Sequence, residues 1–341
     1  TFLLVDYSCA LKLSSPATYI TAIKAASNQG IVIKGSNSLD EYAQVDTFVF
    51  DKTGTLTTGV PKIQRIIAYE GYDDEEVLRI AACLEEHFYH PIATAVVKKA
   101  EDEGIEHEEM HGKLTHVASK GIVSSIDGKR VVIGSLELLE DEKTIISNEQ
   151  KAVIEEYSQK YNLLYLSYDG KLIAIFLIDT PLRGEAIALL KELKEKGKQI
   201  VLLTGDTQKR TETICSLIPF DRVYTQVKPE QKHQVIEQLQ EEGHHVLMIG
   251  DGINDSAALS LANVGIVMAG ASDIARQASD ILFLNEQLTG LEVLENITEQ
   301  LNRQLDANLK HTVGINSFLM GLGLIDVVSP SLLAVLHNVT T

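Results

Sequence analysis

The feature that most constrains the fold of this chain is a regular alternation of buried strands and helices with one long interruption. Short apolar runs, typical of buried parallel strands, alternate with patterns typical of amphipathic helices. The expected strands are Thr47–Phe50, Ile200–Leu203, His245–Ile249, Val264–Met268 and Ile281–Leu284, and the expected helices are Arg183–Lys196, Lys209–Leu217, Glu230–Glu242, Asp255–Ala262 and Asp273–Ala278. This order predicts an α/β fold with a doubly wound parallel sheet.

The interruption predicts a second domain inside the first. About 120 residues follow the first strand before the alternation resumes, which is far too long for one crossover connection. This stretch has its own pattern: helices near Asp74–Glu85, from Pro91 and near Asn148–Tyr161, and short strands near Leu114–Val117, Ile122–Ile126, Val131–Ile133 and on both sides of Asp169-Gly170. We expect an inserted α+β domain at residues 59–175, flanked by parts of the sheet domain at residues 41–58 and 176–295.

The two ends of the chain differ from its middle. Residues 1–23 have few charges, and Val313–Leu336 has one charge, Asp326, in 24 residues, which is close to the length of one bilayer span. Because Ser329-Pro330 breaks the second stretch, we expect partial membrane helices at both ends, with a buried core helix as the alternative. Residues 1–40 are expected to form the end of a membrane helix and a stalk, and residues 296–341 a stalk and partial membrane helices.

The composition limits the partners of the chain. Its 341 residues include 30 Lys and Arg and 48 Asp and Glu, a formal net charge of -18. Nucleic-acid binding needs a basic face, so we expect no nucleic-acid partner. The three cysteines, Cys9, Cys83 and Cys215, form no Cys-x-x-Cys pair, which indicates a reducing compartment and no disulfide framework.

The strongest chemical signal is the segment Asp51-Lys52-Thr53-Gly54-Thr55-Leu56-Thr57. It follows a strand directly, so Asp51 lies at the carboxyl end of that strand, where open α/β sheets bind their ligands. A carboxylate in that place can attack phosphorus and form an aspartyl-phosphate. Gly54 and the threonines suit a tight turn whose N–H groups face phosphate oxygens.

Three further segments follow expected strands or open helices. In Gly250-Asp251-Gly252-Ile253-Asn254-Asp255, two carboxylates four residues apart suit Mg²⁺, with Asp51 and Thr53 as further ligands. Thr204-Gly205-Asp206 can hold a transferring phosphoryl group with a hydroxyl and a backbone N–H. Lys232, within Lys228-Pro229-Glu230-Gln231-Lys232, can bring a cation to the phosphoryl oxygens, although a solvated helix lysine is the alternative.

Together these four segments resemble the phosphorylation-domain motifs of P-type ATPases, within the haloacid-dehalogenase superfamily. Asp179 and Arg183 also match the pattern of this family near its hinge. The resemblance covers nearly the whole chain. It implies a haloacid-dehalogenase-like sheet domain, ATP and Mg²⁺ as cofactors, and an integral membrane pump of which this portion is mostly cytoplasmic. Catalysis then falls to Asp51, Lys52, Thr53, Thr204, Gly205, Asp206 and Lys232.

The inserted domain resembles that of the heavy-metal-transporting P-type ATPases. His90-Pro91, preceded by Leu84-Glu85, is similar to their His-Pro signature, which implies that Glu85 and His90 seat adenine and that Pro91 opens a helix. The family has a Gly-x-Gly loop where this chain has Ser119-Lys120-Gly121, so only Gly121 is kept. Gly134 matches a further glycine of the nucleotide-binding domain.

The resemblance also implies a transported metal. Residues 6–11 are similar to the membrane metal site of the family, but Tyr7 and Ser8 replace the usual first Cys and the Pro and leave only Cys9. One sulfur with oxygen ligands favours a divalent transition-metal ion over Cu(I). His337 is a second candidate ligand, with an interfacial histidine as the alternative.

The family carries an actuator domain with a Thr-Gly-Glu loop, and no Thr-Gly-Glu occurs in this sequence. We therefore expect a fragment whose partners include the actuator and the remaining membrane helices. Two alternatives stay open: a soluble haloacid-dehalogenase-type phosphatase and a non-catalytic nucleotide-binding remnant. Thr53 disfavours the phosphatase, because phosphatases of that type place an Asp two residues after the nucleophile.

Overall fold

The computed structural model describes residues 7–69, 71–106 and 110–324. Contacts divide the chain into two compact units, of which the first comprises the chain up to Asp51, Ala188–Val201 and the chain from Lys228 onward. The second comprises Lys52–Ile187 and Leu202–Val227.

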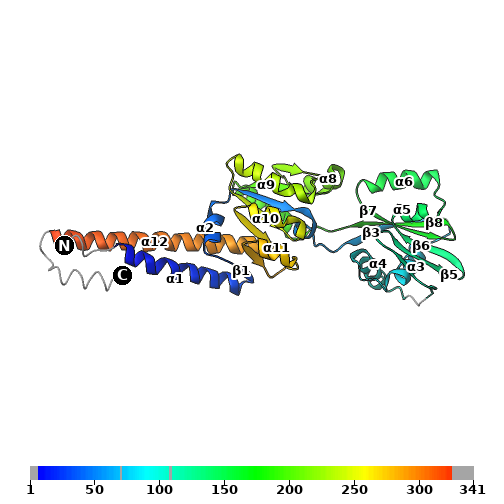
Figure 1. Ribbon diagram of the computed structural model, residues 1–341, viewed down its shortest axis with the longest axis horizontal. Coiled ribbons are helices and arrows are strands. Elements are labelled where there is room, and N and C mark those ends of the chain that lie inside the picture. The colour runs from blue at the N-terminus through cyan, green and yellow to red at the C-terminus, as the bar shows by residue number, and fades with distance from the viewer. Residues whose placement is uncertain (1–6, 70, 107–109, 325–341) are drawn as a thin grey trace. The chain divides into compact units, whose positions relative to one another are not determined.

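The helices and strands are shown in Figure 1. The helices are α1 Tyr7–Asn28, α2 Asn37–Gln44, α3 Asp74–Glu85, α4 Pro91–Asp102, α5 Leu136–Asp141, α6 Asn148–Ser158, α7 Ala186–Glu195, α8 Gln208–Leu217, α9 Lys232–Glu241, α10 Ser256–Leu261, α11 Asp273–Ala278 and α12 Gly290–Leu324. The strands are β1 Ile31–Ile33, β2 Thr47–Asp51, β3 Lys62–Ala68, β4 Thr115–Val117, β5 Gly121–Ile126, β6 Lys129–Gly134, β7 Asn162–Tyr168, β8 Lys171–Asp179, β9 Gln199–Leu203, β10 Arg222–Tyr224, β11 Val246–Gly250, β12 Val264–Val267 and β13 Ile281–Phe283.

The larger sheet has seven strands in the order β1-β13-β12-β11-β2-β9-β10. Strands β2, β11, β12 and β13 are paired in parallel, which confirms the predicted α/β fold with a parallel sheet. Every residue of β2, β11 and β12 is buried, as expected of strands covered on both faces. Strand β1 was not predicted, and it joins the edge antiparallel to β13.

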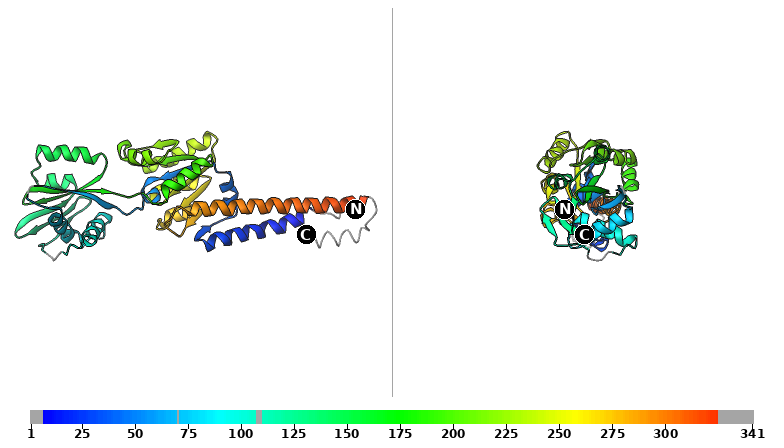
Figure 2. Two further views of the ribbon diagram at one scale, coloured as in Figure 1. Left: turned by 180° about the vertical axis from the view of Figure 1, so that it is seen from behind. Right: turned by 90° about the vertical axis from the view of Figure 1, so that its right-hand side faces the viewer.

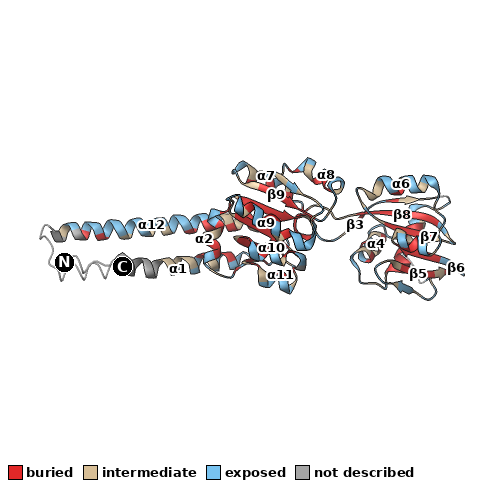
Figure 3. Ribbon diagram, turned by 45° about the horizontal axis from the view of Figure 1, so that its top comes forward, coloured by how far each residue is buried: buried red, intermediate tan, exposed pale blue. Residues whose placement is uncertain are grey.

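The inserted stretch forms a six-stranded antiparallel sheet in the order β3-β8-β7-β6-β5-β4. One face packs against α3 and α4, with Val77, Leu78 and Val96 in its core. The other face packs against α5 and α6, with Leu138 and Ile154 in a second core. Figure 3 shows the central strands β7 and β8 of this sheet as mostly buried.

Helix α3 begins for clear local reasons. Its N-cap residue, Asp73, accepts a hydrogen bond from the Glu76 N–H at 2.8 Å, and three acidic residues occupy the first turn. Both features stabilise a helix N-terminus, where unpaired N–H groups create a positive potential. The other end of α3 brings Glu85 and the residues after it to the pocket described below.

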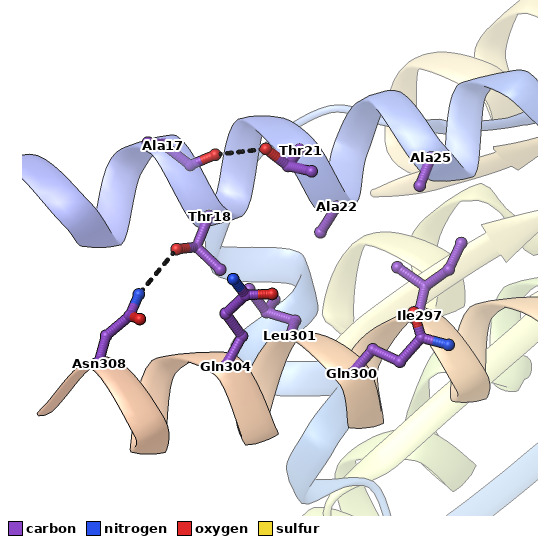
Figure 4. A pocket seen from close by; sticks show the side chains of 10 residues that line it. All are labelled: Ala17, Thr18, Thr21, Ala22, Ala25, Ile297, Gln300, Leu301, Gln304 and Asn308. Carbon is purple, nitrogen blue, oxygen red and sulfur yellow. Dashed lines mark hydrogen bonds between the residues drawn. The ribbon is translucent and has the colours of Figure 1, made fainter. Parts of the chain in front are cut away.

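Helices α1 and α12 lie side by side, as the opposite views in Figure 1 and Figure 2 both show. Between them is a groove of about 380 Å³, at which the amide of Asn308 donates to the Thr18 hydroxyl at 3.3 Å (Figure 4). Within the described ranges, no helix contains an apolar stretch that could cross a membrane. The predicted partial spans include residues 1–6 and 325–336, which lie outside the described part, so they stay a prediction.

Candidate functional site

Asp51 is the last residue of β2, and the residue is only 7% exposed. Strand β11 runs parallel beside β2 with Ile249 opposite Phe50, so both strands end at the same edge of the sheet. Gly250 and Asp251 follow at that edge. The sequence therefore delivers two carboxylates to one place through the shared direction of two buried strands.

Lys232, the first residue of α9, lies between two of these carboxylates. Its Nζ atom is 2.7 Å from Asp51 Oδ1 and 2.6 Å from Asp255 Oδ1, and all three side chains are buried. Burial lowers the pKa of Lys232, but the charges of Asp51 and Asp255 outweigh it and hold the pKa above its usual value. Lys232 is therefore a fixed cation at the end of β2.

One lysine does not balance the negative charge of this cluster. Carboxylate oxygens of Asp51, Asp251 and Asp255 lie within 4.8 Å of one another. Burial and the charge of Asp255 raise the pKa of Asp51 well above its usual value, although Lys232 opposes this and Asp251 adds to it. Three carboxylates against one ammonium group form an oxygen-rich site with excess negative charge. The site fits a divalent cation that prefers oxygen ligands, such as Mg²⁺.

The segment after Asp51 folds into a tight turn. Gly54 has φ of +76°, and its N–H donates to the Thr57 hydroxyl at 3.1 Å. Arg183, which is buried, donates from Nε to the Thr55 carbonyl at 2.8 Å and from Nη2 to the Gly54 carbonyl at 3.0 Å. The sequence singled out Arg183 but could not predict its contacts. The structure shows that Arg183 holds this turn in place through hydrogen bonds to two backbone carbonyls.

Thr204, Gly205 and Asp206 form a second turn, after β9. Asp206 pairs with Lys52, and its backbone N–H donates to the Thr204 hydroxyl at 3.1 Å. The Thr204 N–H donates to the Tyr224 carbonyl at 2.9 Å, and Thr204 is only 2% exposed. These contacts fix Thr204 and hold Lys52, the residue that follows Asp51.

A pocket of about 390 Å³ lies in the inserted domain and brings together the predicted adenine-binding residues. Its lining includes Glu85, His90, Ser119, Gly121 and Gly134. Glu85 is buried, and burial raises its pKa to about 7. His90 is the N-cap of α4, where its Nδ1 accepts a hydrogen bond from the Ile92 N–H at 3.3 Å, and Pro91 opens the helix as predicted.

The sequence did not single out an aromatic pair in the lining of this pocket. The rings of Phe88 and His116 are stacked, with centroids 5.4 Å apart and an interplanar angle of 25°. The only available signal was Phe88 between Glu85 and His90, because His116 is 28 residues away and reaches the pocket through the sheet.

Gly121 and Gly134 have a structural reason to be glycine. They are opposite each other in the β5–β6 pair, and a Cβ atom at Gly121 would lie 2.2 Å from the Ile133 carbonyl oxygen. A Cβ atom at Gly134 would lie 2.2 Å from the Lys120 carbonyl oxygen. Ser119, where the resemblance implied a glycine, has φ of +61°, a conformation that favours glycine.

The comparisons with known proteins place this geometry in a family. A family model described as haloacid dehalogenase-like hydrolase matches residues 45–263, which include Asp51, Lys232, Asp251 and Asp255. The chain belongs to the haloacid dehalogenase-like hydrolases.

Curated relatives of this haloacid dehalogenase-like hydrolase carry names of metal pumps. It is 34% identical to a zinc-exporting P-type ATPase of Mycobacterium marinum, over 100% of this chain and 47% of the relative. It is 33% identical to a manganese-exporting P-type ATPase of Mycobacterium tuberculosis, over 100% of this chain and 48% of the relative. The chain thus spans about half the length of the curated relatives it matches.

Solved structures agree with this similarity. A zinc-transporting PIB-type ATPase in the E2.Pi state superposes with a TM-score of 0.85 at 26% identity, over 98% of this chain and 54% of that chain. The catalytic domain of the CPx-ATPase CopB-B superposes with a TM-score of 0.61 at 30% identity, over 81% of this chain and 98% of that chain.

The two candidate ligands for a transported metal are not placed. Cys9 lies in α1, but the structure does not describe its side chain. His337 lies outside the described residues altogether. Both stay predictions.

Proposed function

We propose that this chain is the ATP-binding and phosphorylation part of a membrane-embedded P-type pump for a divalent transition-metal cation. ATP and Mg²⁺ are its cofactors, and an aspartyl-phosphate at Asp51 is its intermediate. The intact pump includes an actuator domain and further membrane helices. The names of the metal-exporting relatives support the cargo class, with Cys9 and His337 as candidate ligands.

The observation that carries the proposal is the buried contact of Lys232 with Asp51 and Asp255 beside Asp251. Asp51, Asp251 and Asp255 would hold Mg²⁺, with Thr53 as a further ligand, and the ion would offset the charge of the incoming phosphates. The Asp51 carboxylate bonds to the γ-phosphorus as the bond to the bridging oxygen breaks, and ADP leaves with that electron pair. Lys232 stabilises negative charge beside the reacting group.

The turns around Asp51 supply the remaining roles. Thr204 and the Gly205 N–H hold the transferring phosphoryl group, and Asp206 keeps Lys52 in place through their ion pair. Arg183 fixes the turn from Gly54 to Thr55 through hydrogen bonds to the carbonyl oxygens of these two residues. Positioning of this kind is the main source of catalysis in phosphoryl transfer.

The pocket of the inserted domain is the proposed adenine site. An adenine ring stacks on aromatic or imidazole side chains, an interaction of roughly 1–3 kcal/mol per base, and His90 and the Phe88–His116 pair offer such faces. The buried Glu85 carboxylate can accept a hydrogen bond from the adenine amino group. Gly121 and Gly134 line the same pocket.

Phosphoenzyme labelling tests the proposal directly. Radiolabelled ATP with Mg²⁺ should label Asp51, and hydroxylamine should remove the label as it does from an acyl phosphate. Asp51→Asn should abolish the label and keep nucleotide binding in the inserted domain. Label that persists in Asp51→Asn would contradict the proposal. Nucleotide binding without any label in the wild type would support a regulatory remnant, and rapid release of phosphate would support a phosphatase.

A further inference from the structure

Three side chains of types that commonly bind metals meet in the inserted domain, outside the phosphorylation site. Glu86 and His87 follow the last residue of α3, and His111 precedes β4. One ligand atom of each lies within 4.8 Å of the other two. His87 Nε2 is 3.1 Å from His111 Nε2 and 3.3 Å from Glu86 Oε1. Two segments of the chain therefore bring two imidazoles and one carboxylate to a single point.

These separations are close to those of a tetrahedral metal site. Zinc binds imidazole nitrogen and carboxylate oxygen at about 2.0–2.2 Å, so neighbouring ligand atoms of a tetrahedron lie about 3.3 Å apart. The two contacts of His87 Nε2, 3.1 Å and 3.3 Å, are near this value.

The tautomer of His111 is also set for metal binding. His111 Nδ1 is 2.8 Å from the Gly112 carbonyl oxygen. A carbonyl can only accept, so Nδ1 of the neutral ring carries the hydrogen and Nε2 keeps its lone pair. Histidine ligands of metals commonly have this outer hydrogen bond, which fixes the ring and raises its basicity.

The backbone around His111 is held in place. His111 forms an isolated antiparallel bridge with Ile126, and the Gly112 N–H donates to the Ser125 carbonyl at 2.7 Å. On the other side, the Met110 N–H donates to the Cys83 thiol sulfur at 3.4 Å, which ties the segment to α3. The cluster is thus built on fixed backbone rather than on a chance encounter of surface side chains.

We propose that Glu86, His87 and His111 bind a divalent transition-metal ion of the zinc class, with water completing the coordination. Two imidazoles and one carboxylate suit zinc and its neighbours, whereas Mg²⁺ and Ca²⁺ prefer oxygen ligands alone. The alternative is a Glu–His–His hydrogen-bonded chain with no metal, which has the same contacts and is separated by experiment.

The position of the site gives it a role. Glu86 and His87 lie between Glu85 and Phe88, two residues that line the proposed adenine pocket. An ion bound to Glu86 and His87 restrains the backbone that carries their neighbours, so metal occupancy changes the affinity for ATP. This second step rests on the proposed function of the pocket, whereas metal binding itself does not.

Metal titration of the whole chain tests the site. Saturating Mg²⁺ first fills the carboxylate cluster at Asp51, and Zn²⁺ is then titrated by calorimetry, with Co²⁺ as a spectroscopic probe. His87→Ala and His111→Ala should each weaken one equivalent of Zn²⁺ at least about tenfold and change the Co²⁺ absorption band. His245→Ala is the matched control, because this imidazole lies outside the cluster, 3.4 Å from Glu41.

Each outcome decides one step. Equal Zn²⁺ affinity and equal Co²⁺ spectra in the wild type and both cluster variants would leave only the hydrogen-bonded chain and overturn the site. Melting without metal checks that the variants fold, and Glu86→Gln gives a third test without an imidazole change. Zn²⁺ should shift the ATP affinity of the wild type but not of His111→Ala. An unchanged ATP affinity in the wild type would overturn the coupling and leave the metal site standing.

Discussion

The Lys232 ammonium group donates a hydrogen bond to the Asp51 carboxylate at 2.7 Å in the protein interior. Both side chains are more than nine-tenths buried. The same ammonium group contacts Asp255 at 2.6 Å, so one cation serves two carboxylates of the Asp51, Asp251 and Asp255 cluster. Its removal would leave those carboxylates close together in a poorly solvated place. The contact therefore links the stability of the sheet domain to the chemistry at Asp51.

The first prediction concerns this lysine. Lys232→Met should lower the free energy of unfolding by about 3–5 kcal/mol, because loss of one partner leaves buried charge uncompensated. It should also remove phosphorylation by ATP. Chemical denaturation with and without Mg²⁺ measures the first effect, and Mg²⁺ should stabilise the variant by binding the carboxylates that Lys232 no longer neutralises. Lys191→Met, a substitution in α7, is the control. Equal stability of Lys232→Met and the wild type would contradict the prediction.

The second prediction concerns Arg183. Lysine keeps the charge but lacks the forked guanidinium, so Arg183→Lys should lose one of the two hydrogen bonds to Gly54 and Thr55. An unpaired buried carbonyl costs about 1–3 kcal/mol, and the turn beside Asp51 becomes less ordered. The rate of phosphoenzyme formation should fall while ATP affinity of the inserted domain is kept. Arg65→Lys, on β3, should change neither quantity.

The third prediction concerns Ser119. Its φ of +61° costs roughly 1 kcal/mol for a residue with a side chain, so Ser119→Gly should stabilise the inserted domain by up to that amount. Because Ser119 lines the pocket, ATP affinity should also rise. Asp127, with φ of +52° in the β5–β6 turn, gives the control, since Asp127→Gly should leave ATP affinity unchanged. An unaltered or lower ATP affinity in Ser119→Gly would contradict the role assigned to this loop.

The fourth prediction separates two kinds of glycine. Gly121→Ala places a Cβ atom 2.2 Å from the Ile133 carbonyl oxygen, so the β5–β6 pair must move apart. We expect a loss of about 3 kcal/mol or more in the stability of the inserted domain. At Gly128, where φ is +75° and no atom lies within 4 Å of an added Cβ, alanine should cost only about 1 kcal/mol. Thermal unfolding of the two variants measures the difference.

The sequence predicted the parallel strands well because each is a continuous apolar run, and three of them, Thr47–Phe50, Ile200–Leu203 and His245–Ile249, end at a chemical motif. It missed β3, where the pairing with β8 shifts between Ile63 and Arg65. That bulge leaves Gln64 and Arg65 both exposed, so the alternation of period two is lost. Local pattern therefore failed where the register of a distant strand decides the structure.

In the candidate site, too, local sequence predicts some features and long-range contacts decide the others. Asp51, Asp251 and Asp255 could be predicted because strand ends converge at one edge of a sheet. The contacts of Arg183 with the Gly54 and Thr55 carbonyls could not, since no sequence pattern reveals which backbone atoms a distant side chain reaches. The stacked pair of Phe88 and His116 likewise depends on the fold of the inserted sheet.

The last prediction concerns the lifetime of the aspartyl-phosphate. Its hydrolysis needs a base to activate water, and the hydroxyl of Thr53, two residues after Asp51, cannot serve. The exposed side chain of Thr53 leaves room for substitution. Thr53→Asp should therefore supply a base and speed decay of preformed phosphoenzyme, by up to the roughly 10²–10⁴-fold that general-base catalysis provides.

Thr53→Asn is the matched control for that experiment, because asparagine has nearly the same shape as aspartate but lacks the basic carboxylate. The decay is followed after a chase with unlabelled ATP, so that slower labelling caused by the added negative charge does not enter the rate. Faster decay in Thr53→Asp alone would identify Thr53 as the reason that the intermediate persists. Equal decay of the wild type and both variants would instead show that water does not reach the phosphoryl group from the side of Thr53.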